Sequence, residues 1–349
     1  MSVESQSPAV AGERPEADAP LSVPIPVAAS SGVRSPLRQL AAAVAAMRPK
    51  QWTKNGLVLL ALVFSRRLTD PGALWRALVA FAAFSLAASA VYILNDLADR
   101  EKDRQHPRKR LRPIASGRLS MGAAAATAVL CLIGAAALTG ALVTRGMAGL
   151  APADPFAAWG GAPLLFAATL AGYVVINVAY SRWLKHQVLW DVFIVAAGFV
   201  LRALAGAFAV LVPISPWFYL ATTFLALFLA LGKRRAELLQ LGEDAANHRA
   251  ILRDYTLQLL DQLLAVVVTC TLITYSLYTF QGEGASHALM ITIPFVLFGV
   301  FRYLYLIYVR GDGGQPDEVL WRDRQVLGAV VLCVLVVLAL LYGVPLLRH

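Results

Sequence analysis

The sequence predicts an all-α, polytopic membrane protein that forms a bundle of nine transmembrane helices. The 349-residue chain is 58% hydrophobic and only 15% charged, which is far from the usual balance of a soluble protein. In addition, its apolar residues gather in nine stretches close to the roughly 20 residues that a spanning helix needs. These stretches cover residues 55–70, 73–94, 120–144, 158–180, 188–210, 216–232, 260–281, 286–309 and 326–346.

Lysine and arginine residues are distributed unequally between the two sides of these spans. The segments before the first, third, fifth, seventh and ninth spans hold most of them, whereas the loops on the other side hold few: Arg66, Arg67, Arg76 and Arg145. Because basic loops tend to stay in the cytoplasm, we expect a multi-pass protein of the cell inner (plasma) membrane. Its N-terminus and its Asp-rich loop would be cytoplasmic, and its C-terminus would lie outside.

Two regions differ clearly in composition. Residues 1–35 are rich in Pro, Ala, Ser and Glu, have no hydrophobic periodicity and lack the apolar core of a secretory signal, so they predict a disordered N-terminal tail. Residues 36–349 would then form the nine-helix transmembrane catalytic domain. The three cysteines, Cys131, Cys270 and Cys333, all fall within apolar spans, which is typical of packing residues and not of disulfides or metal ligands.

The most informative stretch is Tyr92–Ser120, which begins on the last turns of the second span. At 100° per residue, Asp96, Asp99 and Asp103 fall at 0°, about 300° and about 340°, so three carboxylates would share one helical face. Together with Asn95 they predict an oxygen-rich site where a hydrophobic helix meets water. Mg²⁺ is usually held by one or two carboxylates and completes its shell with substrate phosphates and water.

The same stretch continues with a run of basic side chains. They would face the phosphate charge that the metal ion leaves uncompensated. The alternative is that the whole stretch is a solvated charged loop that only sets the orientation in the membrane. The run consists of Arg104, Arg108, Lys109, Arg110 and Arg112.

Basic and aromatic residues also precede the first span. Lys50, Trp52 and Lys54 form either an interfacial anchor of the ordinary kind or a rim that contacts phosphate. Tyr92 lies one turn before Asp96, and it is either an interfacial tyrosine or a hydroxyl that reaches a sugar or a phosphate. The sequence leaves both pairs of alternatives open.

The fifth span carries two ionisable residues, Asp191 and Arg202. They are 11 residues apart, so they share a helical face but lie about 16 Å from each other and cannot pair directly. Charged residues inside a span are costly and indicate function, with an ion pair to a neighbouring span as the alternative. Tyr180 and Lys185 lie just before this span, in and beside a short basic turn.

Charged residues also mark two later spans. Lys233, Arg234 and Arg235 follow the sixth apolar stretch and indicate its cytoplasmic end or a role at the site. Arg302 lies within the eighth span, where we expect it to be buried against a carboxylate.

These motifs resemble a known family. Asn-Asp-x-x-Asp-x-x-x-Asp at the end of the second span, in a nine-helix bundle, resembles the UbiA-type intramembrane prenyltransferase superfamily. RPKQWTKN, YSRWLKHQVLWD, GFVLRALAG, GKRRAEL and FRYLYLIYVRGDGGQPDEVL are similar to the decaprenyl-phosphate phosphoribosyltransferase branch of that superfamily. The resemblance extends over about residues 45 to 345 and leaves only the tail unmatched.

The resemblance implies an Mg²⁺-dependent transfer of 5-phosphoribose from phosphoribosyl diphosphate to a polyprenyl phosphate at the cytoplasmic membrane face, with release of diphosphate. The metal ligands would be Asn95, Asp99 and Asp103, and Lys185 and Arg202 would hold the lipid phosphate. The expected catalytic set is Asn95, Asp96, Asp99, Asp103, Lys185 and Arg202. The expected substrate-binding set is Lys50, Lys54, Tyr92, Lys109, Arg112, Tyr180 and Asp191.

Two other functions remain as alternatives. The first is transfer of a prenyl group from a prenyl diphosphate to an aromatic or quinone-precursor acceptor, which would use the same bundle and the same Asp motif. The second is a transporter that uses buried charges, although here the charges gather at one membrane face. We expect the lipid bilayer as a partner and no nucleic acid, and the sequence leaves a homo-oligomer open.

Overall fold

The computed structural model describes residues 35–147, 149–150, 154–241, 250–281 and 287–343. Within these ranges the chain is helical and contains no strand. The described residues from Pro36 onward belong to one compact unit. The predicted disordered tail, residues 1–35, lies outside the described residues except for Ser35, so its disorder stays a prediction.

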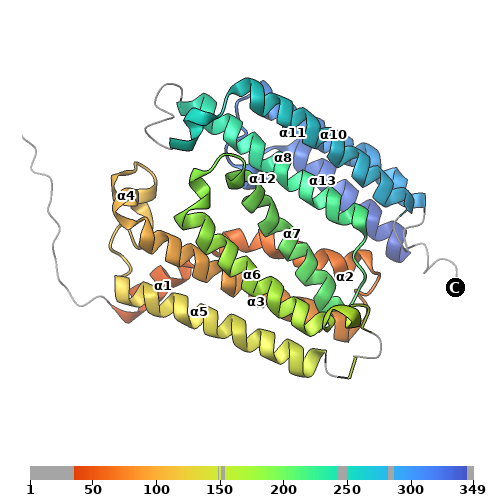
Figure 1. Ribbon diagram of the computed structural model, residues 1–349, viewed down its shortest axis with the longest axis horizontal. Coiled ribbons are helices and arrows are strands. Elements are labelled where there is room, and N and C mark those ends of the chain that lie inside the picture. The colour runs from red at the N-terminus through yellow and green to blue at the C-terminus, as the bar shows by residue number, and fades with distance from the viewer. Residues whose placement is uncertain (1–34, 148, 151–153, 242–249, 282–286, 344–349) are drawn as a thin grey trace, which may run out of the picture. The chain divides into compact units, whose positions relative to one another are not determined.

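Eight helices among the described residues are long and apolar enough to cross a membrane, and they correspond to the second to ninth predicted spans (Figure 1). The prediction of an all-α, multi-pass membrane protein is therefore confirmed. The helices are α3 (Pro71–Ala98), α5 (Met121–Ala141, extended by η3, Leu142–Gly146), α6 (Gly161–Arg182), α7 (Trp190–Val210), α8 (Pro216–Leu241), α10 (Leu257–Gln281), α11 (Ile293–Tyr308, preceded by η9, His287–Thr292) and α13 (Arg324–Leu338, extended by η10, Ala339–Gly343).

Shorter helical pieces connect these spans. Two of them, α1 and α4, lie near the end of the bundle that the basic residues predict to be cytoplasmic (Figure 1). The shorter pieces are α1 (Pro36–Ala46), α4 (Arg100–Gln105), η2 (Lys109–Leu111), η5 (Ala157–Trp159), η6 (Leu184–His186), η8 (Ala250–Asp254) and α12 (Pro316–Arg322).

The first predicted span, residues 55–70, has a different form from the others. It consists of a 3₁₀ helix, η1 (Pro49–Leu59), followed by one short α-helix, α2 (Leu60–Phe64). The sequence of η1, PKQWTKNGLVL, contains five polar or charged residues and a glycine, so its apolar run is too short to form a full membrane-spanning α-helix.

Two polar side chains of η1, Asn55 and Trp52, find hydrogen-bond partners in α3. Asn55 Nδ2 donates a hydrogen bond to Ser85 Oγ (3.1 Å), and Trp52 Nε1 donates to Ser89 Oγ (3.1 Å). Since an unsatisfied polar group costs several kcal/mol in the membrane, these partners explain why a polar segment is stable at this depth.

A second difference concerns α8, which the apolar pattern ended at residue 232. The helix continues to Leu241 through the segment KRRAELLQL. That segment alternates charged and apolar residues at helical spacing, so the helix extends beyond the part that hydropathy detects. Hydropathy therefore predicts the apolar part of α8 but not its end.

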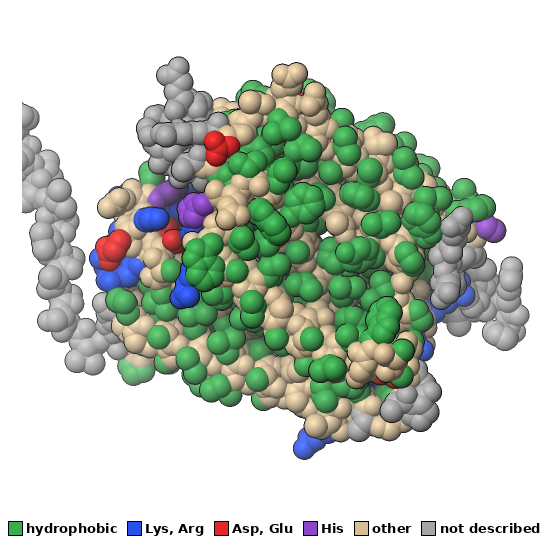
Figure 2. Space-filling model, in the orientation of Figure 1, with side chains coloured by type: hydrophobic (Ala, Val, Ile, Leu, Met, Phe, Trp, Pro, Cys, Tyr) green, Lys and Arg blue, Asp and Glu red, His purple; other side chains and the backbone are tan. Residues whose placement is uncertain are grey.

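The helices pack in sequence-related pairs. α3 packs on α5, α6 on α7, α8 on α10, and α11 on α13, while α7 also contacts α8 and η1. α4 and α2 lie at opposite ends of the long helices in Figure 1. Charged side chains gather around the α4 end in Figure 2, and the broad face between the two ends is largely hydrophobic, as expected of a surface in contact with lipid.

An ion pair fixes α11 against the start of α13. Arg302 Nη2 donates to Asp323 Oδ2 (2.8 Å), and Asp323 Oδ1 caps α13 by accepting from the backbone N–H groups of Gln325 and Val326. The predicted carboxylate partner of Arg302 is thus confirmed. The hydrogen bond from Arg302 holds the pKa of Asp323 below its usual value.

Candidate active site

Two buried carboxylates and two half-buried guanidinium groups lie together at the α4 end of the bundle and form what we call the acidic–basic cluster: Arg48, Asp96, Asp103 and Arg112. Arg48 Nη2 donates to Asp96 Oδ1 (2.5 Å), and Arg112 Nη1 donates both to Asp96 Oδ1 (3.1 Å) and to Asp103 Oδ2 (2.6 Å). The two carboxylates are 3% and 4% exposed. Each buried carboxylate therefore has at least one guanidinium partner, as buried charged groups require.

The helix that carries these carboxylates is not continuous, contrary to the single face we predicted. Asp99 has φ −92° and ψ 8°, so α3 ends just before it and α4 begins just after it. Asp96 and Asp103 nevertheless lie together because Arg112 contacts both. The break at Asp99 is small, because its N–H still donates to the Asn95 carbonyl (2.9 Å) and its carbonyl accepts from the Asp103 N–H (2.8 Å).

The turn between α6 and α7 lies beside the same region. Ser181 Oγ donates to Asn95 Oδ1 (2.5 Å), and Lys185 Nζ lies 3.5 Å from Asp99 Oδ1. Asp99 is half-buried, with 36% of its side chain exposed. The structure therefore brings Asn95, Asp99 and Lys185 to one end of the bundle with the cluster.

The predicted substrate-binding residues, apart from Arg112 of the cluster and Asp191, lie on the elements around the cluster. The guanidinium carbon of Arg48 lies 5.1 Å from the centre of the Tyr92 ring, a cation–π contact. The other positions differ in exposure. Lys50 on η1 and Lys109 on η2 are exposed, whereas Lys54 on η1 and Tyr180 at the end of α6 are half-buried.

Asp191 is a predicted substrate-binding residue that has protein partners. It is fully buried, accepts a hydrogen bond from Arg234 Nε (2.5 Å) and another from the Tyr255 hydroxyl (2.7 Å). The Tyr255 oxygen in turn accepts from the backbone N–H of Leu189 (2.8 Å). Burial, and then the hydrogen bond to Asp191, raise the pKa of Tyr255 above its usual value. The ion pair that the sequence left as an alternative for Asp191 is therefore present.

Arg202 also lies apart from the cluster. Its three hydrogen bonds go to Asn55 Oδ1 (2.7 Å), the Gly198 carbonyl (2.7 Å) and the Tyr173 hydroxyl (2.8 Å). The residue is 5% exposed and lies three turns deeper on α7 than Asp191. All three acceptors are neutral, so Arg202 links α7 to η1 and α6, and the structure does not bring it together with the other five predicted catalytic residues.

The residues at this end of the bundle fit a divalent cation that also binds a substrate. Asp96 Oδ2 is buried without a hydrogen-bond partner, and Asp99, three residues further along the chain, offers a half-exposed carboxylate. Within the described ranges, no three His, Cys, Asp or Glu residues lie close enough to hold a metal ion by themselves. Because Mg²⁺ commonly takes only one or two carboxylates and fills its shell with substrate phosphates and water, these residues fit an ion that is shared with a substrate.

The sequence reasoning did not assign roles to two residues of this site, Arg48 and Ser181. Arg48 is 48 residues from its partner Asp96, and Ser181 is 86 residues from its partner Asn95. Spacing cannot predict such pairs. Both residues lie in basic or polar segments at the predicted cytoplasmic face, and this position was the sequence feature that could have identified them.

Comparisons with known proteins agree with this fold and site. The model of the UbiA prenyltransferase family matches residues 56–321. The decaprenyl-phosphate phosphoribosyltransferase of Mycobacterium tuberculosis is 34% identical over 294 residues, which cover 83% of this chain and 90% of that protein. The enzyme of the same name from Corynebacterium glutamicum is 35% identical over 317 residues, which cover 86% of this chain and 88% of that protein.

Solved structures show the same fold. A UbiA homologue from Archaeoglobus fulgidus bound to DMAPP and Mg²⁺ superposes with a TM-score of 0.61 and 18% identity, covering 84% of this chain and 96% of the homologue. The same homologue bound to GPP and Mg²⁺ gives a TM-score of 0.59 and 19% identity, over 85% and 96% of the two chains. Since the family model covers most of the sequence, the chain is a membrane transferase that belongs to the UbiA prenyltransferase family.

Proposed function

We propose that this protein transfers 5-phosphoribose from phosphoribosyl diphosphate to a polyprenyl phosphate, decaprenyl phosphate in particular, and releases diphosphate. The observation that carries the proposal is the similarity, over more than four fifths of both chains, to two enzymes named for this acceptor and this group. The acidic–basic cluster supports it, because both substrates carry phosphate and the cluster combines carboxylates with arginines.

In this reaction a phosphate oxygen of the lipid attacks C1 of the ribose. A new C1–O bond forms, the C1–O bond to diphosphate breaks, and diphosphate leaves with the bonding electron pair. The lipid phosphate is already anionic near neutral pH, so the reaction needs no strong general base. The protein must instead hold the two substrates in line and compensate the charge of the leaving group.

The carboxylate side of the site would hold the donor. Asn95, Asp99 and Asp103, with Asp96 beside them, would hold Mg²⁺, which as a bound cation neutralises charge on a departing diphosphate. Arg48 and Arg112 hold the buried carboxylates in place. Around them, Lys50, Lys54, Tyr92 and Lys109 would contact the donor phosphates.

The lipid phosphate would lie on the other side, near the turn between α6 and α7. Lys185 supplies a cation there, 3.5 Å from Asp99 and 21% exposed. Asp191 and Arg234 anchor the first turn of α7, directly after this basic turn. We therefore assign Lys185 to the lipid phosphate and Asp191 to positioning of the turn.

Arg202 requires a different role from the lipid contact that the sequence suggested. Each of its three nitrogens donates to a protein acceptor, on Asn55, Gly198 and Tyr173, about 16 Å deeper than Asp191. A phosphate group lies at headgroup depth, and a charged group at the bilayer centre is costly. We therefore propose that Arg202 positions η1, the element that carries Lys50 and Lys54.

The site would face the cytoplasm of the cell inner membrane. The donor is water-soluble and the acceptor carries its phosphate at the membrane surface, so the two can meet only at the interface. The side with the cluster also carries most of the basic residues, which favours a cytoplasmic position.

Prenyl transfer is the second candidate, because the structural neighbours are solved with DMAPP or GPP and Mg²⁺. The two functions can be separated with purified protein in lipid vesicles. One set of reactions receives radiolabelled phosphoribosyl diphosphate and polyprenyl phosphate, and the other receives radiolabelled prenyl diphosphate and an aromatic acceptor. We expect label in the lipid product of the first set alone. Label in the prenylated acceptor, with none in the polyprenyl phosphate, would replace our proposal with prenyl transfer.

A further inference from the structure

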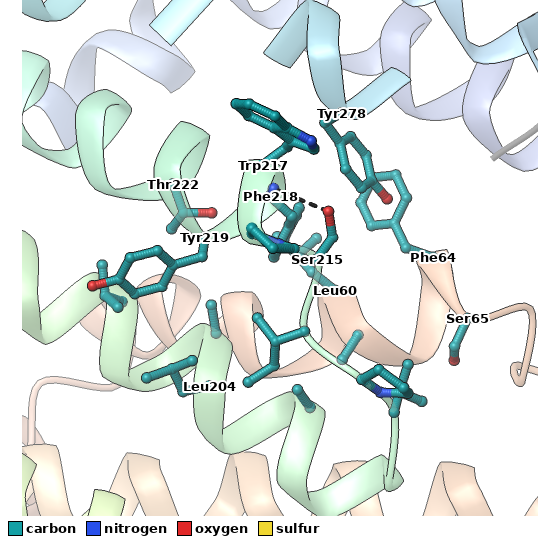
Figure 3. Close-up of a pocket in the computed structure, with 18 of the residues that line it drawn as sticks. Leu60, Phe64, Ser65, Leu204, Ser215, Trp217, Phe218, Tyr219, Thr222 and Tyr278 are labelled. Carbon is teal, nitrogen blue, oxygen red and sulfur yellow. Dashed lines mark hydrogen bonds between the residues drawn. The ribbon is translucent and has the colours of Figure 1, made fainter. Parts of the chain in front are cut away.

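A cavity of about 540 Å³ lies between α2, α7, α8 and α10 (Figure 3). In Figure 3, Phe64 of α2, Trp217 and Phe218 of α8 and Tyr278 of α10 surround it, with Leu204 of α7 on the opposite side. Its volume is within the range of pockets that bind small molecules. None of the functions assigned above uses this space.

The cavity is separate from the acidic–basic cluster. It lies at the opposite end of the bundle, where Arg67 Nη1 donates to the Val210 carbonyl and Arg76 Nε donates to the Ala209 carbonyl. α3 starts at this end with Pro71, and Asp96 of the cluster lies 25 residues later, about 38 Å along its axis.

The cavity also uses a different face of α7 from the Arg202 contacts. Val200, Leu204 and Ala207 line it at helical spacing. Arg202 is about 200° around the helix from Val200 and points to Asn55 of η1. The wall of the cavity and the buried arginine are therefore on opposite sides of α7.

The inner part of the cavity is aromatic. The rings of Phe64, Phe218 and Tyr278 contact one another, with centroid distances of 5.8 Å for Phe64–Phe218, 5.8 Å for Phe64–Tyr278 and 5.5 Å for Phe218–Tyr278. Such a wall offers a large apolar surface and favours the burial of a hydrocarbon chain.

The rim of the cavity is cationic. Arg66 and Arg67 both line it and are exposed, while none of its lining residues is acidic. The acidic neighbour in this segment, Asp70, accepts hydrogen bonds from the backbone N–H groups of Gly72 and Ala73 and so caps α3. Positive charge at the mouth of an apolar cavity is complementary to a lipid with an anionic headgroup.

We propose that this cavity binds one acyl chain of an anionic phospholipid from the membrane leaflet opposite the cluster, with Arg66 and Arg67 at the headgroup phosphate. The tail of the polyprenyl acceptor fits the rim less well, because its phosphate is at the cluster and its far end carries no charge. The two exposed arginines select the charged headgroup, and the aromatic wall holds the chain.

The proposal can be tested by native mass spectrometry of the full chain, purified in detergent, delipidated and titrated with phosphatidylglycerol or with phosphatidylcholine. We expect one phosphatidylglycerol to bind more tightly than phosphatidylcholine. Replacing both rim residues, Arg66→Gln with Arg67→Gln, should weaken phosphatidylglycerol about 30-fold. The control is Arg145→Gln, which removes an exposed arginine outside the cavity wall and should change nothing.

A second variant, Ala203→Trp, fills the cavity from α7 and should remove the tight site for both lipids. Its unfolding temperature shows whether it still folds, and the arginine pair provides the test if it does not. Equal affinity for the two lipids in the wild-type protein would overturn the proposal. A second result would also overturn it: polyprenyl phosphate displaces the bound phospholipid and binds the arginine double variant as tightly as the wild-type protein. The cavity would then hold the acceptor tail. Neither result depends on transferase activity.

Discussion

Asp99 is the carboxylate with the clearest functional position at the scale of single residues. It stands at the break between α3 and α4, is half-exposed and lies 3.5 Å from Lys185, whereas Asp96 and Asp103 are buried in ion pairs. A group that must bind metal and substrate phosphate needs this access. Asp103, which we also assign to the cation, and its neighbour Asp96 would hold that cation from the buried side.

Replacement of Asp99 with Asn should abolish transfer without unfolding the protein. The substitution keeps the size of the side chain and removes the charge that binds a cation, so we expect the initial rate to fall by at least about 100-fold. The measurement is the rate of labelled lipid formation, together with the unfolding temperature. Asp70→Asn is the matched control, because Asp70 caps α3 at the opposite end and Asn retains a capping oxygen. An Asp99→Asn protein with the wild-type rate would remove the metal assignment.

Arg112 compensates two carboxylates at once, and its removal tests the cation site without any activity measurement. In Arg112→Gln, Asp96 and Asp103 lose a shared positive charge. We expect the affinity for Mn²⁺, used as a spectroscopic substitute for Mg²⁺, to increase about tenfold in the absence of substrates.

The readout for Arg112→Gln is electron paramagnetic resonance of free Mn²⁺ during a titration. Arg108→Gln provides the control, since Arg108 is exposed in the same loop and lies outside the acidic–basic cluster. Equal Mn²⁺ affinity in the wild-type and Arg112→Gln proteins would mean that the cluster does not bind the cation.

At the scale of elements, the close packing of η1 on α7 determines where the basic approach to the site lies. Gly206 permits this contact, because a Cβ atom there would lie 2.1 Å from the Val58 carbonyl oxygen. Small residues at helix contacts allow such backbone approach in membranes. Arg202 and Asn55 add a hydrogen bond across the same interface.

Gly206→Ala should therefore destabilise the bundle. The added methyl group overlaps a backbone atom that no side-chain rotation can move away, and overpacking of this kind costs about 1–3 kcal/mol. Thermal unfolding in detergent measures the effect. Gly172→Ala on α6 is the control, since a Cβ atom there meets nothing within 4 Å. An equal unfolding temperature for the two variants would contradict the packing described for η1.

The sequence predicted the long helices well because each contains a sufficient apolar run. α7 was expected at 188–210 and is found at Trp190–Val210. The sequence predicted η1 and the end of α8 less well. Hydropathy indicates which segments contact lipid, but it does not show whether a polar segment is helical. The 3₁₀ conformation of η1 depends on partners in α3 such as Ser85 and Ser89, which are remote in the chain.

The candidate site was predictable to a similar degree. The spacing of Asp96, Asp99 and Asp103 identified the acidic region. The same reasoning could not assign partners, so Arg48 was not selected and Arg202 was placed at the lipid phosphate. Periodicity placed Asp191 and Arg202 three turns apart on one helix, which α7 confirms, but it could not give the neutral acceptors that surround Arg202. Tertiary contacts decide such roles.

At the scale of the whole molecule, the charged cluster and the cavity with the arginine rim lie at opposite ends of a hydrophobic bundle. This polarity predicts the orientation in the membrane. Basic residues are concentrated at the end with the cluster, so that end should face the cytoplasm.

Single cysteines introduced at exposed positions can test this orientation. In intact cells, a membrane-impermeant maleimide should label Arg145→Cys, at the end of η3, and should not label Arg110→Cys, beside the cluster, until the cells are opened. The native cysteines lie within membrane-spanning helices, buried or half-buried, so their background labelling should be low. Labelling of Arg110→Cys alone in intact cells would reverse the proposed orientation.

The central claim is that the cluster serves phosphoribosyl transfer to a lipid phosphate with the help of a divalent cation. The most direct measurement is the mass spectrum of the lipid after purified protein in vesicles has received decaprenyl phosphate, phosphoribosyl diphosphate and Mg²⁺. We expect the lipid to gain one phosphoribosyl group, with one diphosphate released for each lipid consumed, and a chelator to stop both. An unchanged lipid mass in the presence of Mg²⁺, or an equal yield with the chelator, would contradict the account.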